Sequence, residues 1–219
     1  MTLPGVAYID DLAVQAFARH LETAMDPGVP GRSIVAGMRA FLEDKPHLAP
    51  APPWRRPPAT GYRAVELLAT AAGLSSAQIE HGRRASRIEL AGSAWILDPA
   101  DGLPELLDLM TDRADVVLVA DADDPATGPV LEALDLAGRF PVIRPAEPVP
   151  MGPDRPTLLI DDDWSPILAA AFARGTGTAL VDRFGAGSGT PELRATDLPG
   201  LLPGVADWLD RHARTEGER

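Results

Sequence analysis

The sequence contains no cysteine, and this absence excludes several kinds of chemistry at once. Disulfide bonds, a thiolate nucleophile and cysteine ligands for a metal ion are all impossible. Lysine is almost as scarce, because Lys45 is the only lysine among 20 basic residues. Codon usage in a GC-rich genome would explain this bias without any functional cause. The excess of arginine over lysine is therefore not by itself a sign that the protein recognises a ligand or partner.

Long apolar runs and an excess of positive charge are also missing. No run approaches the roughly 20 apolar residues that a membrane-spanning helix requires. The first residues, Met-Thr-Leu-Pro, lack the basic and apolar segments of a signal peptide. We therefore expect a cytoplasmic protein without a membrane partner. The formal net charge of −12 argues against a nucleic-acid partner, because binding to phosphates depends on clustered Lys and Arg.

The first hundred residues predict mainly helices. Residues 5–9 resemble a short strand that leads to Asp10 and Asp11, and residues 12–25 have the spacing of a helix. Further helices are predicted at residues 33–42, 62–72 and 76–85, two of them with a serine as the first cap. The prolines of residues 46–58 remove backbone donors, so this segment is predicted to be an extended connector.

From residue 115 onward, short β-branched runs alternate with helices. Predicted strands cover residues 116–119, 140–143, 157–160 and 178–181, and a last helix covers residues 202–213. This alternation is typical of a parallel sheet that is covered by helices on both faces. We therefore predict an α/β fold with a doubly wound parallel sheet in the second half of the chain.

Acidic residues follow three of the predicted strands. They are Asp10 with Asp11, Asp121 with Asp123 and Asp124, and Asp161 with Asp162 and Asp163. Ligands of open parallel sheets bind beyond the carboxyl ends of the strands, and carboxylate oxygens are preferred ligands of Mg²⁺. Without a cation, such carboxylates repel one another and their pKa values rise. The alternative is that some of them, above all Asp123 and Asp124, only cap helices.

Two stretches resemble conserved regions of the haloacid dehalogenase-like (HAD) hydrolases. Residues 98–140 are similar to the family's second region, in which a P-G helix leads to a strand ending in Ser/Thr-Asn and then to an L-G-L helix. Residues 158–185 resemble the fourth region, with Asp161-Asp162-Asp163 in the place of the family's G-D-D. The resemblance covers residues 98–202 well and the first hundred residues loosely.

The resemblance implies a Rossmann-like α/β core and an inserted cap. The core would comprise residues 1–25 and 97–219, and the helical cap would comprise residues 26–96 with the proline-rich connector 46–58. In related enzymes such a cap closes over the site and selects substrates. Closure of a lid excludes water from the reacting centre.

The resemblance also implies roles for individual residues. Asp10 would be the nucleophile, and Asp10, Asp162 and Asp163 would hold Mg²⁺ if the protein binds this cofactor. Ala120 and Asp121 fall where the family places a Ser or Thr and an Asn, and the Ser or Thr holds the phosphate. Arg144 or Arg155 would have to replace the family's lysine, although a guanidinium is not equivalent to a lysine point charge.

Several residues that phosphoryl transfer needs are missing. Leu12 stands where a second acid is expected, Ala120 has no hydroxyl, and Ile167 replaces an acid that positions the metal. Loss of one general acid costs about 10²–10⁴-fold in rate. Our preferred hypothesis is a catalytically degenerate HAD-like protein that binds a protein partner, a second copy of itself or a small-molecule ligand. The alternatives are a phosphatase-like Mg²⁺-dependent HAD hydrolase and an altered small-metabolite enzyme that uses the same pocket.

Three other features were weighed. The four histidines are scattered without an i, i+4 pair, which argues against a zinc site. The glycine-rich segment 185–189 precedes no clear helix, so it is interpreted as a loop rather than a phosphate cradle. Trp54, Trp95 and Trp164 are candidates for partner contacts or for buried anchors.

Overall fold

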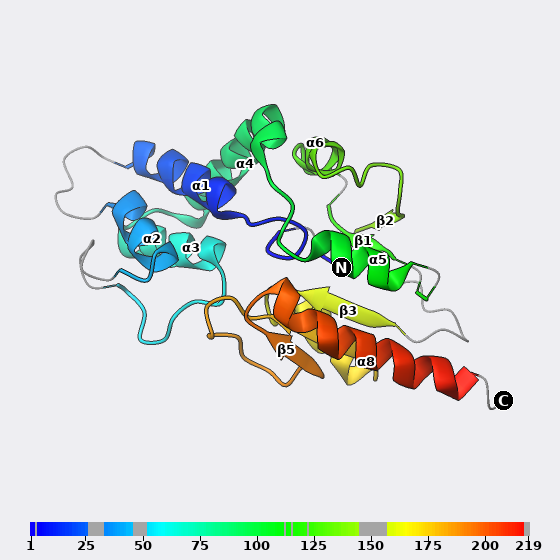
Figure 1. Ribbon diagram of the computed structural model, residues 1–219. Coiled ribbons are helices and arrows are strands. Elements are labelled where there is room, and N and C mark those ends of the chain that lie inside the picture. The colour runs from blue at the N-terminus through cyan, green and yellow to red at the C-terminus, as the bar shows by residue number, and fades with distance from the viewer. Residues whose placement is uncertain are drawn as a thin grey trace.

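The computed structural model describes residues 1–2, 4–25, 33–45, 52–111, 113–114, 116–121, 123–144 and 157–216. The first half of the chain is helical, with α1 (Asp11–Thr23), α2 (Ile34–Leu42), α3 (Gly61–Ala71), α4 (Ser76–Ser93) and the short 3₁₀ helix η2 (Ala94–Ile96) (Figure 1). The second half alternates, with α5 (Leu103–Met110), β1 (Leu118–Val119), α6 (Thr127–Ala133), β2 (Val142–Ile143), β3 (Leu158–Asp161), α7 (Pro166–Ala173), β4 (Gly177–Val181), β5 (Leu193–Ala195) and α8 (Leu198–Glu216). The chain is therefore a mixed α/β protein with small parallel sheets.

The helices α1 to α4 pack around one apolar core, which we call the helical unit. Phe17 and Leu21 of α1 are fully buried against Met38 of α2 and Val65 of α3. Gly82 brings α4 close to α1, since a Cβ atom there would lie 2.5 Å from Leu21. The sequence predicts α1 as part of the α/β core formed by residues 1–25 and 97–219. In the structure the buried face of α1 packs mainly against the other helices of the helical unit.

The predicted helices are present, but two of them are longer than expected. α8 covers Leu198–Glu216 and not only residues 202–213. α4 does not end near residue 85 and continues to Ser93, because Leu90 carries its buried face one turn further. Residues 52–58 of the proline-rich connector form no helix or strand, and residues 46–51 lie outside the described residues. Among the helices that the structure describes, none has both the length and the hydropathy that a membrane span requires.

The start of α4 is fixed by a reciprocal capping box. The Ser75 hydroxyl accepts from the Gln78 amide at 3.3 Å, and the Gln78 side chain accepts from the Ser75 amide at 2.9 Å. Replacing Ser75 with Ala is expected to lower the free energy of unfolding by about 1 kcal/mol. Urea denaturation measures this. Ser93→Ala is the control, because the Ser93 hydroxyl only bonds back to the Glu89 carbonyl. An equal loss in both variants would contradict the capping account.

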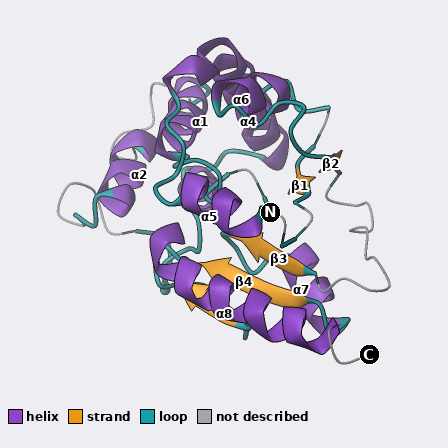
Figure 2. Ribbon diagram, turned by 45° about the vertical axis from the view of Figure 1, so that its right-hand side comes forward, coloured by secondary structure: helices purple, strands orange, loops and turns teal. Residues whose placement is uncertain are grey.

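The sheet formed by β3, β4 and β5 is parallel and is covered on both faces. Ile160, Ala179 and Val181 point to the core shared with α5 and α8. Leu159 and Leu180 point to the opposite face, where they pack with α7. Figure 2 shows α8 along one face of this sheet and α7 on the other. The burial of side chains on both faces explains why β3 and β4 are mostly apolar and do not alternate with polar residues.

The first two residues of the chain join this sheet to the pair β1 and β2. The Val119 amide donates to the Met1 carbonyl at 2.8 Å, and the Thr2 amide donates to the Ile160 carbonyl at 3.1 Å. Thr2 is paired in parallel with Val119. The β1 and β2 pair is also parallel. Residues 1–2 therefore lie between β1 and β3, and hydrogen bonds run continuously from β2 to β5.

The strand predicted at residues 5–9 is wrong. Gly5 has a φ of 70° and turns the chain, so that the Gly5 amide donates to the Tyr8 carbonyl at 3.1 Å. This conformation suits glycine, which has no Cβ to clash. Tyr8 forms only isolated bridges, to Pro4 and Pro99. The Ala100 amide also donates to Ala7, so the chain enters and leaves the helical unit side by side.

Candidate functional site

Several of the candidate site residues lie at the carboxyl ends of the parallel strands. Thr2, Ala120 at the end of β1 and Asp161 at the end of β3 lie at the same edge of the sheet. Ligands of open parallel sheets bind at this edge. We therefore take it, together with the junction to the helical unit, as the candidate site.

Asp161 is the buried anchor of this edge. Its carboxylate accepts from the Thr2 hydroxyl at 3.0 Å, the Ser165 hydroxyl at 2.8 Å and the Asp162 amide at 2.9 Å. Ser165 also caps α7 through the Leu168 amide. Asp161 thus ties the first residues, β3 and α7 together, which is a structural task. Thr2 and Ser165 were not found from the sequence, because neither lies in a recognisable motif.

Asp162 lies against the turn at Gly5. A Cβ atom on Gly5 would lie only 2.2 Å from Oδ2 of Asp162, so the close approach requires glycine at this position. Burial raises the pKa of Asp162 well above its ordinary value, and the nearby Asp161 and Asp10 raise it further. The pKa of Asp163 is also raised, by burial first and by Asp161 second.

Asp10 is buried at the start of α1, with 6% of its surface exposed. Its Oδ2 atom has no hydrogen-bond partner among the described residues, and its side chain does not cap the helix. Burial raises the pKa of Asp10 to about 6, Asp11 adds to the rise, and Arg183 opposes it. Asp10 interacts electrostatically with Asp162, and it follows a turn and not the predicted strand.

Arg87 links the helical unit to the α/β part of the chain. Its Nε atom lies 2.7 Å from Oδ2 of Asp124, and its Nη1 donates to the Tyr8 hydroxyl at 3.4 Å. The Tyr62 hydroxyl is buried in the same region without a partner in the described residues. Burial raises the pKa of both tyrosines. Asp124 also accepts from the Ala126 amide at 2.8 Å, in the turn before α6 (Thr127–Ala133), but no described side chain caps that helix, so the prediction that Asp124 caps a helix is wrong.

A second ion pair connects the same two parts. Arg183, in the loop after β4, makes a bidentate pair with Asp11 at the start of α1, with distances of 2.6 and 2.9 Å. Bidentate Arg–carboxylate pairs fix geometry better than single contacts do. Neither arginine was identified from the sequence, because their partners lie far away in the chain.

The remaining predicted residues surround the loop after β1. Ala120 is buried and offers no hydroxyl, and Asp121 accepts from the Asp123 amide at 3.0 Å. Arg144 lies 3.0 Å from Asp123 in an exposed ion pair. Arg155 lies outside the described residues. In the described part of the chain no three Asp, Glu or His side chains converge as ligands for one metal ion, so Asp10, Asp162 and Asp163 do not form such a set here.

No protein-family model matches this chain, and no curated protein matches it significantly. The resemblance of the sequence to the HAD hydrolases therefore stays a prediction.

Proposed function

We propose that this chain is a HAD-like α/β protein that has lost phosphoryl-transfer catalysis and acts by binding a protein partner or a ligand. The observation that carries the proposal is the set of residues at the sheet edge. Thr2, Ala120 and Asp161 lie at the strand ends. By the resemblance, Ala120 falls where the family has a phosphate-binding hydroxyl, and Asp161 falls on the glycine that precedes the metal-positioning acid. Of these, only Asp161 is an acid, and its oxygens already accept three hydrogen bonds.

The strand order supports a doubly wound core. Numbered along the chain, with residues 1–2 as the first strand, the order across the hydrogen-bonded strands is 3-2-1-4-5-6. This is the order of the Rossmann type, and its switch point lies between the first and the fourth strand. In this chain the switch point lies between Thr2 and β3. A ligand-binding crevice is expected there on general grounds.

The same strand order moves the nucleophile position away from Asp10. In the HAD family the nucleophile follows the first strand. If residues 1–2 take the place of that strand, the next residue in the sequence is Leu3, whose side chain has no carboxylate. Ala120 follows Val119, the residue paired with Thr2, and it also lacks a nucleophile or a proton donor.

Two arginines at the junction beside the site are engaged with acids. Arg87 is paired with Asp124, and Arg183 is paired with Asp11. Both pairs hold the helical unit against the α/β part rather than offering charge to a phosphate. Phosphoryl transfer depends on positive charge placed around the transferred group. An internally neutralised site is therefore better suited to a scaffold or a binding protein.

One observation favours the alternative, a Mg²⁺-dependent hydrolase. Asp10 is buried and Asp162 is half-buried, the two carboxylates interact electrostatically, and Oδ2 of Asp10 has no partner among the described residues. Two such carboxylates could share a divalent cation with waters and a phosphate. Asp10, Asp162 and the metal would then supply the charge that the sheet edge lacks.

The two functions are separated by an assay for Mg²⁺-dependent hydrolysis of p-nitrophenyl phosphate and a panel of metabolite phosphates. We expect turnover no greater than the baseline without protein, and the same result for Asp10→Asn and Asp162→Asn. Turnover that requires Mg²⁺ and disappears in Asp10→Asn would overturn the proposal. Light scattering of the chain alone, and mixed with the products of neighbouring genes, tests binding, and a monomer in every mixture would count against a protein partner.

A further inference from the structure

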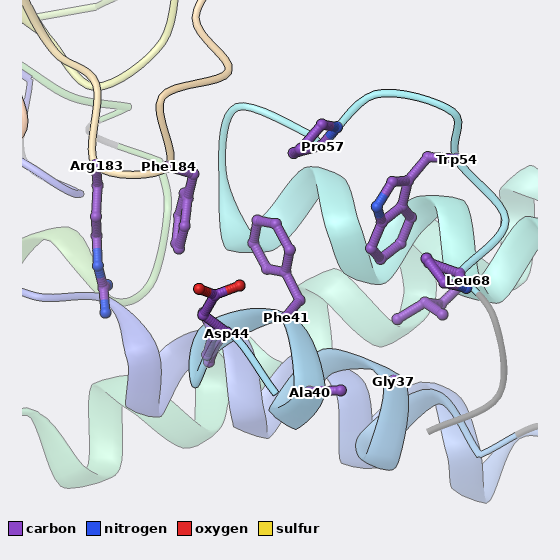
Figure 3. A pocket seen from close by; sticks show the side chains of 11 residues that line it. Gly37, Ala40, Phe41, Asp44, Trp54, Pro57, Leu68, Arg183 and Phe184 are labelled. Carbon is purple, nitrogen blue, oxygen red and sulfur yellow. The ribbon is translucent and has the colours of Figure 1, made fainter. Parts of the chain in front are cut away.

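A cavity of about 430 Å³ lies between the helical unit and the loop after β4 (Figure 3). Phe41, Leu68 and Trp54 line it from the helical unit, and Phe184 with Arg183 line it from the loop. Cavities of about 300–1,000 Å³ with mostly apolar walls and few polar groups are typical sites for small molecules. Its size and lining therefore indicate a small-molecule site.

Three aromatic rings form one wall of the cavity. The Phe41 ring centroid lies 5.7 Å from that of Trp54, nearly perpendicular to it, and 4.4 Å from that of Phe184. Figure 3 shows Phe41 between the two other rings. All three rings are only partly buried. The faces of aromatic rings carry partial negative charge, which attracts organic cations.

The charges at the cavity also favour a cation. Arg183 is the one basic side chain in the described lining, and both of its terminal nitrogens are held by Asp11. Its guanidinium also lies over Phe184, 5.1 Å from the ring centroid. The carboxylate of Asp44 makes no ion pair with any described residue, since the adjacent Lys45 is paired with Glu43. Figure 3 shows the Asp44 carboxylate directed toward Phe41 and Phe184.

We propose that this cavity binds a small organic cation with an apolar or aromatic body, such as an amine or a quaternary ammonium compound. The body lies against Phe41, Trp54 and Phe184, and the charge pairs with Asp44. The net charge of −12 raises the local concentration of cations around the protein. This site uses none of the strand-end carboxylates. The proposal is therefore independent of whether the sheet edge catalyses a reaction.

The test compares three probes that share one aromatic ring and differ in charge. Benzyltrimethylammonium is a cation, benzyl alcohol is neutral, and benzylsulfonate is an anion. Isothermal titration calorimetry or ligand-observed NMR with the full chain is expected to show binding that is about tenfold tighter for the cation than for the alcohol. The anion is expected to bind weakest. Equal affinity for all three probes, or no binding of the cation, would overturn the proposal.

Variants assign the binding to this cavity. Asp44→Asn is expected to weaken the binding of the cation about threefold to tenfold and to leave the affinity for benzyl alcohol unchanged. Asn tolerates the left-handed conformation of this position, where φ is 51°. Trp54→Leu and Phe184→Leu, each tested separately, are expected to weaken the binding of both the cation and benzyl alcohol. Trp95→Phe is the control, because Trp95 is 80% exposed and does not line the cavity. Unchanged cation affinity in Asp44→Asn refutes the assignment.

Discussion

Replacing Arg87 with methionine is expected to lower the free energy of unfolding by about 3 kcal/mol. The substitution removes the cation that pairs with Asp124 and the donor that faces the Tyr8 hydroxyl. The Arg87 and Asp124 side chains are only 15% and 23% exposed, so water replaces the lost contacts poorly. Methionine keeps an unbranched side chain, although a shorter one, and the helix propensity of α4. The loss therefore reports the interaction and not a broken helix.

Urea denaturation at pH 7 measures this effect. Arg139→Met is the matched control, because Arg139 pairs with Asp135 at 3.3 Å where both side chains are exposed. We expect the control to change stability by less than about 0.5 kcal/mol. In an Asp124→Asn background the effect of Arg87→Met should shrink, since the two residues share one interaction. Equal losses for Arg87→Met and Arg139→Met would show that the junction is not held by this pair.

The helices could be predicted from the sequence because their signals are local. The bounds of α5 follow from Gly102, Pro104 and the apolar residues after them, and Ser33, Ser75 and Ser165 each cap a helix in the structure. The strands β3 and β4 follow from apolar runs that are buried on both faces. β5 was missed, because Pro191, Glu192 and Arg194 interrupt any apolar run there.

The candidate site could be predicted only in part, because its contacts span the whole chain. Asp161 and Asp162 stand at a strand end, as their positions after an apolar run predict. The approach of Asp10 to Asp162 results instead from the turn at Gly5, and its local sequence was misread as a strand. The pairs of Arg87 and Arg183 join segments that are far apart, and no local pattern encodes such partners.

Burial of the Asp10 carboxyl makes stability depend on pH in a defined direction. Its pKa is about 6 in the folded protein and 3.8 in a solvated reference, so the folded state holds the proton more tightly. The contribution of Asp10 is therefore fully present below about pH 4 and is lost as the pH rises through about 6. A shift of this size corresponds to about 3 kcal/mol. The titratable and charged groups that face Asp10 are Asp11, Asp162, Arg183, Arg87, Tyr8 and Tyr62.

Asp10→Asn is accordingly expected to raise the free energy of unfolding by about 2 kcal/mol at pH 8 and to change it little at pH 4. The amide cannot ionise, and no helix-capping bond is lost because the Asp10 side chain makes none. The neighbouring Asp11→Asn is the control with the opposite sign. It breaks the bidentate pair with Arg183 and should lower stability at pH 8 by about 1 kcal/mol. Urea denaturation at both pH values measures the free energy of unfolding of the two variants. If Asp10→Asn gains the same stability at pH 4 and at pH 8, the buried charge is not the cause of the gain.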